Sequence, residues 1–355
     1  MSSISKIRTN GNGEHGKDSS RHREWVSMLG HFETVDGGLD FHGSDTPPSE
    51  QPPSPNSGRA PEERGPSVAF GLTVCDERFI EGEISVEVEF DVVDHRSVAE
   101  IVLQHDTRTL EMLNAGLNAP VGFFSVRRWV SKDSAETAGD HLPKKSWQNF
   151  TAGGDRGNLQ PNRKYRLQAW RRGSSVTLTI NGVDVAECRV PQPDAGQQMG
   201  LFCASHGKVR FRHFRVDPVR PRAFVVMQFN TKKYDDLYEQ VISPVCKRMG
   251  LDAFRADETF SPGLVVADIT KQIAESRVVI AEITPANPNV YYEVGYADAL
   301  RKPLILIADR TGKDLPFDVR PYRTIFYEDS IGGKQRVEDT LSQYLVNIME
   351  GAPAL

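Results

Sequence analysis

The last third of the chain alternates short apolar runs with segments of helical periodicity. The apolar run 223–227 is followed by the segment 234–249, in which apolar residues recur every three or four positions. Gly250 comes directly after this segment, as expected for a helix C-terminal cap. Strand–helix alternation at this spacing predicts right-handed crossovers and an open parallel sheet, which makes this region an α/β domain. Further strands are predicted at 251–255, 277–283, 303–307 and 323–327, and further helices at 266–274, around residue 293 and at 336–350.

The segment 287–297 places a carboxylate where a helix should be apolar. Asn287 suits an N-cap, and Pro288 suits the first helical position, where the missing N–H costs nothing. Val290 and Val294 fall on one stripe of the helix, and Glu293 falls at the edge of that stripe. A carboxyl group held against apolar neighbours resists ionisation, and such groups cluster at functional sites. Glu293 is therefore the candidate catalytic residue; the alternative is a boundary glutamate paired with an arginine or a backbone donor.

Polar and acidic residues follow the predicted strands at the edge where open α/β sheets bind ligands. These loops contain no glycine-rich phosphate cradle, which argues against a dinucleotide fingerprint or a P-loop. Asp257 is a candidate for ribose binding, because its two carboxylate oxygens can accept from vicinal hydroxyls. In that case Asp257→Ala should raise KM more than it lowers kcat, whereas a turn or cap role would lower stability only. The predicted substrate-binding residues are Met227, Gln228, Phe229, Asp257, Glu282, Thr284, Asn287, Asn289 and Tyr292.

From about residue 81 to residue 216 polar and apolar positions alternate in the manner of strands. The alternation is nearly strict over 84–90, and it continues at 166–170, 175–180 and 209–216. Asn181-Gly182 stands between two such runs and predicts a tight hairpin. Many short strands separated by turn residues predict an all-β sandwich, and residues 24–43 are expected to add a first strand or two.

Several side chains of this region leave binding interpretations open. Glu87 and Glu89 share the solvent face of a strand, which disfavours a pair of glycosidase carboxylates. The basic segment 210–213 can meet an acidic partner, although a solvated strand face is the default interpretation. Three tryptophans either line a sugar groove or pack in the core, and core packing is favoured: Trp129, Trp147 and Trp170.

The composition limits the compartment and the partners. The chain has 355 residues, enough for two domains with tails, and its net charge of −5 with a pI near 6.0 suggests no nucleic acid and no anionic membrane as partner. A long apolar run and a signal-peptide pattern are both lacking, so a cytoplasmic protein is expected. Segment 1–22 is polar and expected to be disordered, and 45–66 is a Pro-rich loop. Four scattered cysteines without metal-ligand spacing are expected to be reduced thiols: Cys75, Cys188, Cys203 and Cys246.

The C-terminal region resembles the nucleoside 2-deoxyribosyltransferase-like superfamily. The similarity rests on FVVMQFN (224–230), VVIAEIT (278–284) and above all NPNVYYEVGYADAL (287–300) followed by KPLILI (302–307). It implies a flavodoxin-like fold, related in architecture to Toll/interleukin-1 receptor-type NAD-cleaving domains, with Glu293 at the position of the family's catalytic glutamate. The sequence departs from the family pattern in two places. Asn287 and Asn289 stand where an aspartate manages the leaving base, and Glu282 stands where many relatives have Asp. The first departure puts transfer between bases in doubt.

Cleavage of NAD remains compatible with these residues. Breaking a ribosyl–base bond builds positive charge on C1′ of the sugar, so a nearby carboxylate stabilises the transition state more than the ground state. Nicotinamide leaves NAD as a neutral base and has less need of a general acid than adenine or thymine. NAD would be the substrate, so no separate cofactor is predicted.

The N-terminal region is similar in pattern to concanavalin A-like jelly rolls of the laminin-G type. The similarity rests on 165–187 and 200–216, and such domains bind glycans, peptides or proteins. The sequence thus predicts a jelly-roll sandwich (23–217) followed by a flavodoxin-like domain (221–355). The predicted function is an N-glycosidase regulated by the sandwich, and the resemblance suggests a homo-oligomeric immune, anti-phage effector. The alternatives are a deoxyribosyltransferase in nucleotide salvage and a non-catalytic module that binds a nucleotide signal.

Overall fold

The structure is a computed structural model that describes residues 23–43, 68–131, 145–193, 195–228, 231–255, 265–310, 322 and 324–350. The predictions for segments 1–22 and 45–66, and for Phe229 and Asp257, lie outside the described residues. Within the described residues no helix is long and apolar enough to cross a membrane.

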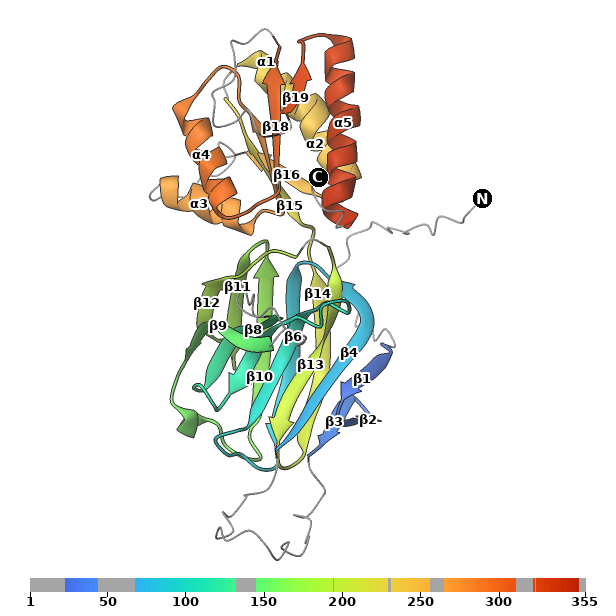
Figure 1. The fold of residues 1–355 in the computed structure, drawn as a ribbon, viewed down its shortest axis with the longest axis vertical. Helices are drawn as coiled ribbons and strands as arrows, with labels where there is room; N and C mark the ends of the chain where they lie inside the picture. Colours follow the sequence, from blue (N-terminus) through green and yellow to red (C-terminus); the bar gives the residue numbers. More distant parts are fainter. Residues whose placement is uncertain are drawn as a thin grey trace, which may run out of the picture.

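The N-terminal part is a sandwich of two antiparallel sheets, each with seven strands in the described ranges (Figure 1). A 3₁₀ turn (Arg156–Asn158) precedes β10. In spatial order sheet A consists of β1 (Trp25–Leu29), β4 (Ala69–Phe79), β13 (Gln197–Ser205), β6 (Val98–His105), β7 (Met112–Asn118), β8 (Phe124–Ser131) and β9 (Lys145–Gly153). Sheet B consists of β12 (Val183–Arg189), β11 (Ser175–Ile180), β10 (Lys164–Arg172), β5 (Gly82–Phe90), β14 (Val209–Pro218), β3 (Gly38–His42) and β2 (His31–Val35).

Alternation along the strands builds the core between the two sheets. Ile84, Val86 and Val88 of β5 are at most 1 % exposed, whereas Glu87 and Glu89 point to the outer face of sheet B. The predicted Asn181-Gly182 turn joins β11 to β12, and both residues have positive φ, at 53° and 81°. The sandwich predicted from the sequence is therefore confirmed.

The C-terminal part contains a five-stranded parallel sheet within the described residues, in the order β16-β15-β17-β18-β19. Numbered along this part of the chain, the order is 2-1-3-4-5, which is the flavodoxin-like arrangement. The strands are β15 (Arg222–Val226), β16 (Asp252–Arg255), β17 (Val278–Glu282), β18 (Leu304–Asp309) and β19 (Thr324–Tyr327), and the α/β prediction is confirmed.

Helices cover both faces of this sheet (Figure 1). One face carries α3 (Val265–Glu275) and α4 (Pro288–Ala299), and the other carries α1 (Lys232–Leu237), a π-helical turn (Tyr238–Ile242), α2 (Ser243–Arg248) and α5 (Ile331–Glu350). Helix α5 begins five residues earlier than the sequence predicted. The segment predicted as the single helix 234–249 is helical throughout its middle and contains the π turn, and its buried residues face the core.

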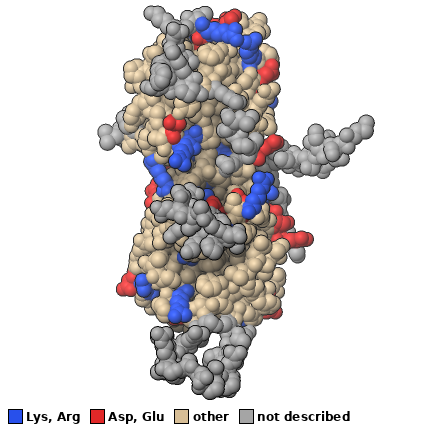
Figure 2. All heavy atoms as spheres, viewed as in Figure 1, with Lys and Arg blue, Asp and Glu red and all other residues tan. Residues whose placement is uncertain are grey.

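The sandwich contacts the edge of the parallel sheet at which the strands begin, not the edge at which they end. Of the residues that meet it, Arg277 directly precedes β17, and Lys302 stands two residues before the start of β18. In Figure 1 the strands of the α/β part point away from the sandwich. The sandwich therefore contacts the α/β part directly, at the edge of the sheet opposite the loops that follow the strands. Over both parts, charged side chains of both signs are dispersed on the face shown in Figure 2.

Candidate active site

The carboxyl ends of β15 and β17 form the switch point of the sheet, since the chain turns from β15 toward β16 on one side and β17 on the other. In open α/β sheets this is where ligands bind. The chain leaves β15 through Met227 and Gln228, and leaves β17 through Ile283 and Thr284. Helix α4 follows β17, so its N-terminal end also lies at this edge.

Glu293 lies on α4, at the border between the buried and exposed sides of the helix. Val290, Val294 and Ala297 are at most 4 % exposed and pack on the sheet, as predicted. Glu293 is half-buried beside them, and burial alone raises the pKa of its carboxyl group to about 7 from the usual 4.5. Among the described residues no hydrogen bond or ion pair reaches this carboxylate. A helical side chain leans toward the N-terminus of its helix, which directs Glu293 toward the switch point.

The asparagines of the same segment have a structural role. The Asn287 side-chain oxygen accepts from the backbone N–H of Asn289 at 2.9 Å and caps α4, as the sequence predicted. Tyr292 is 54 % exposed and faces solvent, whereas its neighbour Tyr291 is half-buried, with its hydroxyl 3.4 Å from the Ile283 carbonyl oxygen. Of the two tyrosines, the structure places Tyr291 and not Tyr292 nearest to the strand end.

Glu282 ends β17 and is only 2 % exposed. Its carboxylate accepts from the backbone N–H of Thr284 at 3.1 Å and from the Thr284 hydroxyl. Burial raises the pKa of Glu282 to about 7, against the Thr284 hydrogen bonds and the nearby Lys233, which lower it. Near neutral pH this carboxyl group can therefore donate a proton as well as accept one.

Four residues of this edge were not predicted from the sequence. Asp309 ends β18; its backbone N–H donates to the Thr284 hydroxyl at 2.7 Å, and its carboxylate pairs with Lys233. The Tyr234 hydroxyl donates to the Thr284 carbonyl. Tyr327, at the end of β19, is buried, and within the described residues its hydroxyl has no hydrogen-bond partner. The position of Asp309 at the end of an apolar run was a signal that the sequence offered.

The two carboxyl groups with a raised pKa, those of Glu282 and Glu293, belong to different layers of the α/β part. Glu282 shares the face of β17 with Val278 and Ile280, which pack against α1, α2 and α5, whereas Glu293 is on the helix that covers the opposite face. Met227 is only 6 % exposed and packs in the core, and Gln228 beside it is half-buried.

A second polar cluster lies on the outer face of sheet A. Glu100 is completely buried and receives two hydrogen bonds from Arg127 Nε, at 2.8 and 3.1 Å, and one from Nη2, at 2.9 Å. The Arg127 guanidinium stacks 3.6 Å from the ring centroid of Trp147, which pairs across the strands with Trp129. Core packing was the favoured prediction for these tryptophans. Trp147 does pack against a hydrophobic cluster, which lies on the outer face of sheet A and includes Phe202. Trp129 and Trp170 are half-buried and lie outside the core between the sheets.

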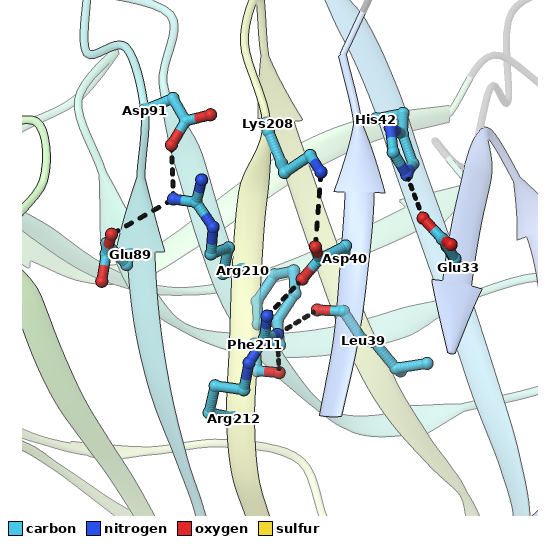
Figure 3. Close-up of polar contacts among 10 residues, drawn as sticks. All are labelled: Glu33, Leu39, Asp40, His42, Glu89, Asp91, Lys208, Arg210, Phe211 and Arg212. Carbon is cyan, nitrogen blue, oxygen red and sulfur yellow. Dashed lines mark hydrogen bonds and ion pairs between the residues drawn. The ribbon is translucent and has the colours of Figure 1, made fainter. Parts of the chain in front are cut away.

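The basic residues near 210–213 are largely neutralised within sheet B (Figure 3). Arg210 pairs with Glu89 at 3.1 Å and with Asp91, and Arg212 pairs with Asp40 at 2.7 Å. The default interpretation, a solvated strand face, is the one that fits. Within the described ranges no group of His, Cys, Asp and Glu is arranged to hold a metal ion.

Comparison with known proteins gives only partial similarities of fold. No family model matches the chain, and no curated protein matches it. Among solved structures, a carbohydrate-binding module from Bacillus subtilis, CBM66, is 12 % identical with a TM-score of 0.34, covering 54 % of this chain and 92 % of its own. A CMP N-glycosidase from Clostridium botulinum is 18 % identical with a TM-score of 0.29, covering 35 % of this chain and 98 % of its own. A 2-deoxyribosyltransferase from Bacillus psychrosaccharolyticus is 15 % identical with a TM-score of 0.29, covering 36 % and 96 %. No activity follows from similarities of this size.

Proposed function

We propose that the α/β part is an N-glycosidase that hydrolyses the ribosyl–base bond of NAD or a related nucleotide. The observation that carries the proposal is Glu293: a half-buried carboxyl group at the switch-point edge, with a pKa raised to about 7 by burial and no ion-pair partner among the described residues. A structural glutamate at a helix border would normally be paired or fully solvated. A carboxylate kept unpaired beside apolar neighbours suits a role in which positive charge develops next to it.

The reaction needs only this charge and a water molecule. As the bond between C1′ and the nicotinamide nitrogen breaks, its electron pair stays on nitrogen, and the sugar becomes oxocarbenium-like. The ionised Glu293 carboxylate stabilises that charge, or bonds to C1′ until water replaces it, and water then leaves its oxygen on C1′ and releases one proton. Nicotinamide departs neutral. For a base that needs a proton on leaving, Glu282 is the group at the same edge that holds one near neutral pH.

The alternatives predict different products. A deoxyribosyltransferase would move a deoxyribosyl group between bases, and a nucleotide-signal receptor would bind without cleavage. Purified protein incubated with NAD, CMP and deoxynucleosides, with and without a free acceptor base, distinguishes the three by chromatography. Base release without acceptor supports the glycosidase; base exchange alone supports the transferase. Binding by calorimetry with neither product supports the receptor and rejects the proposal.

For the sandwich we propose recognition of a polyhydroxylated or peptide ligand on the outer face of sheet A. The support is the half-buried pair Trp129 and Trp147, which lies outside the core between the sheets, beside the Arg127 guanidinium. Trp129→Ala should abolish binding in a glycan or peptide screen without unfolding the sandwich. A glycosidase joined to a recognition module would suit an anti-phage effector, which survival of infected cells expressing Glu293→Gln or the parent protein would test.

A further inference from the structure

The sandwich is joined to the α/β part by hydrogen bonds that fix one arrangement. The backbone N–H of Ser174 donates to the Ala274 carbonyl at 2.9 Å, and Gln192 Nε2 donates to the Arg277 carbonyl at 2.7 Å. The backbones approach so closely that a Cβ on Gly173 would lie 2.6 Å from the Ala274 carbonyl oxygen. Backbones packed this closely cannot shift past each other without a clash, so the two parts meet in a fixed geometry.

Buried charges strengthen this requirement for one geometry. Glu81, Arg171, Arg277 and Lys302, two from each part, are at most 5 % exposed. Lys302 Nζ donates to three oxygens: those of Ala274 at 2.6 Å, Ser276 at 2.7 Å and the Gln192 side chain at 2.9 Å. A buried ammonium is tolerated only where its donors are satisfied, and one of these three acceptors comes from the sandwich.

The sandwich reaches the C-terminal half of α4 at two points. Arg189 of β12 donates to the Tyr296 hydroxyl, and its guanidinium carbon lies 5.9 Å from the centroid of that ring. The second point is Lys302, whose backbone N–H donates to the Ala297 carbonyl at 3.0 Å while its ammonium bonds Gln192. The end of α4 is thus held both through a side chain on its surface and through the residue that closes its last turn.

Tyr296 is one helical turn from Glu293, so the two side chains lie on neighbouring positions of the same side of α4. A helix transmits displacement along its axis as a nearly rigid rod, and these residues are about 5 Å apart along it. We propose that Arg189 and Gln192 are positioning residues: through Tyr296 and Lys302 the sandwich fixes α4, and with it Glu293, from the far edge of the sheet. We call the holding of α4 by Arg189 and Gln192 the clamp, and it rests on the contacts alone. The effect of the clamp on catalysis by Glu293 rests on the proposed function.

The two contacts differ in expected weight. The Arg189–Tyr296 bond is exposed to solvent, where a hydrogen bond contributes little. Gln192 is half-buried and serves two partners, so its removal leaves the Arg277 carbonyl and a buried ammonium each short of a partner. Gln192→Ala is therefore the stronger perturbation and Arg189→Ala the weaker, and the double variant removes both points of support.

The test compares full-length Gln192→Ala, Arg189→Ala and the double variant with two matched controls. Gln160→Ala and Arg96→Ala remove the same residue types from exposed positions of the sandwich away from the junction. Hydrogen–deuterium exchange of the amides of α4 is measured first, because it shows how firmly α4 is held and needs no enzymatic activity. Nucleotide cleavage is measured second, as kcat and KM separately, and as kcat against pH.

The clamp predicts faster exchange in the second half of α4 for Gln192→Ala, more in the double variant, and none in the controls, with the sheet unchanged. It further predicts a fall in kcat of about tenfold or more in the double variant at similar KM, since a small misplacement of a catalytic group is costly. It also predicts a change in the pH midpoint of kcat, because the burial that raises the pKa of Glu293 is altered; loss of folded protein alone would not move that midpoint. In Arg189→Lys the amides of α4 should exchange more slowly than in Arg189→Ala, because lysine can still donate to the Tyr296 hydroxyl.

Unchanged exchange in α4 of the double variant would overturn the clamp. Faster exchange with unaltered kcat and pH midpoint would overturn the positioning of Glu293. If the parent protein cleaves no nucleotide, the proposed function fails, and the exchange data still decide the clamp.

Discussion

Replacing Glu293 by glutamine should lower activity and raise stability, in a pH-dependent manner. The substitution keeps the size of the side chain and removes its charge. Loss of the charge that faces C1′ should cost roughly 3 kcal/mol or more of transition-state stabilisation, about a hundredfold in rate. The effect on folding has the opposite sign, because the charged carboxylate is unfavourable where it lies.

The magnitude follows from the pKa shift. Burial raises the pKa of Glu293 from 4.5 to about 7, and at 1.36 kcal/mol per unit this amounts to roughly 3 kcal/mol between the charged and neutral forms. Because the side chain is only half-buried, screening by solvent reduces the expected contribution to about 1–2 kcal/mol.

The sign follows from proton binding. Between the unfolded and folded pKa values the folded state holds the proton and the unfolded state releases it, so stability falls as pH rises. For Glu293 this loss runs from about pH 4.5 to about pH 7 and is nearly complete at pH 8. Glutamine has no such dependence. Glu293→Gln should therefore match the parent near pH 5 and exceed it by about 1–2 kcal/mol at pH 8.

Urea unfolding at pH 5 and pH 8, with nucleotide cleavage measured on the same preparations, checks both effects. The exposed Glu239→Gln controls for a change of net charge and should alter neither stability nor rate. Equal stability gains at the two pH values would refute the burial argument. Cleavage within a few-fold of the parent would refute the catalytic role, whatever the stability data show.

Three further predictions concern the framework and the assembly. Gly173→Ala should cost at least about 1 kcal/mol more in urea unfolding than Gly182→Ala, since both residues have positive φ but only Gly173 would clash, with the Ala274 carbonyl; equal costs would contradict the tight junction. Glu100→Gln should lower the free energy of unfolding by about 3–5 kcal/mol, because it leaves the buried Arg127 guanidinium uncompensated. Glu89→Gln, at a half-buried pair, should lower it by about 1 kcal/mol or less. Thermal unfolding that ranks the two variants the other way would refute the buried ion pair of Glu100 and Arg127. Specific activity should rise with protein concentration if copies of the chain complete the site, and a flat response over a hundredfold dilution would exclude this.

Local patterns were enough to predict the elements and their caps. A strand in a two-sheet sandwich must alternate, and a helix on a sheet must repeat every three or four residues, so each element appears in its own few residues. The same holds for the Asn287 cap, the Asn181-Gly182 turn and the half-buried position of Glu293, which depend on neighbours within one or two turns. The fold class and the principal candidate residue therefore follow from the order of the amino acids alone.

Contacts between distant segments decided the rest. In the sequence, Arg277 and Lys302 are ordinary surface residues that flank apolar strands; only the docked sandwich, 84 to 110 positions away in the chain, buries them. The pairing of Lys233 with Asp309 and the position of the tryptophans on an outer face depend in the same way on which strands become neighbours. Periodicity shows that a side chain will be covered, but the covering surface comes from another part of the chain, and only the tertiary structure brings that part into place.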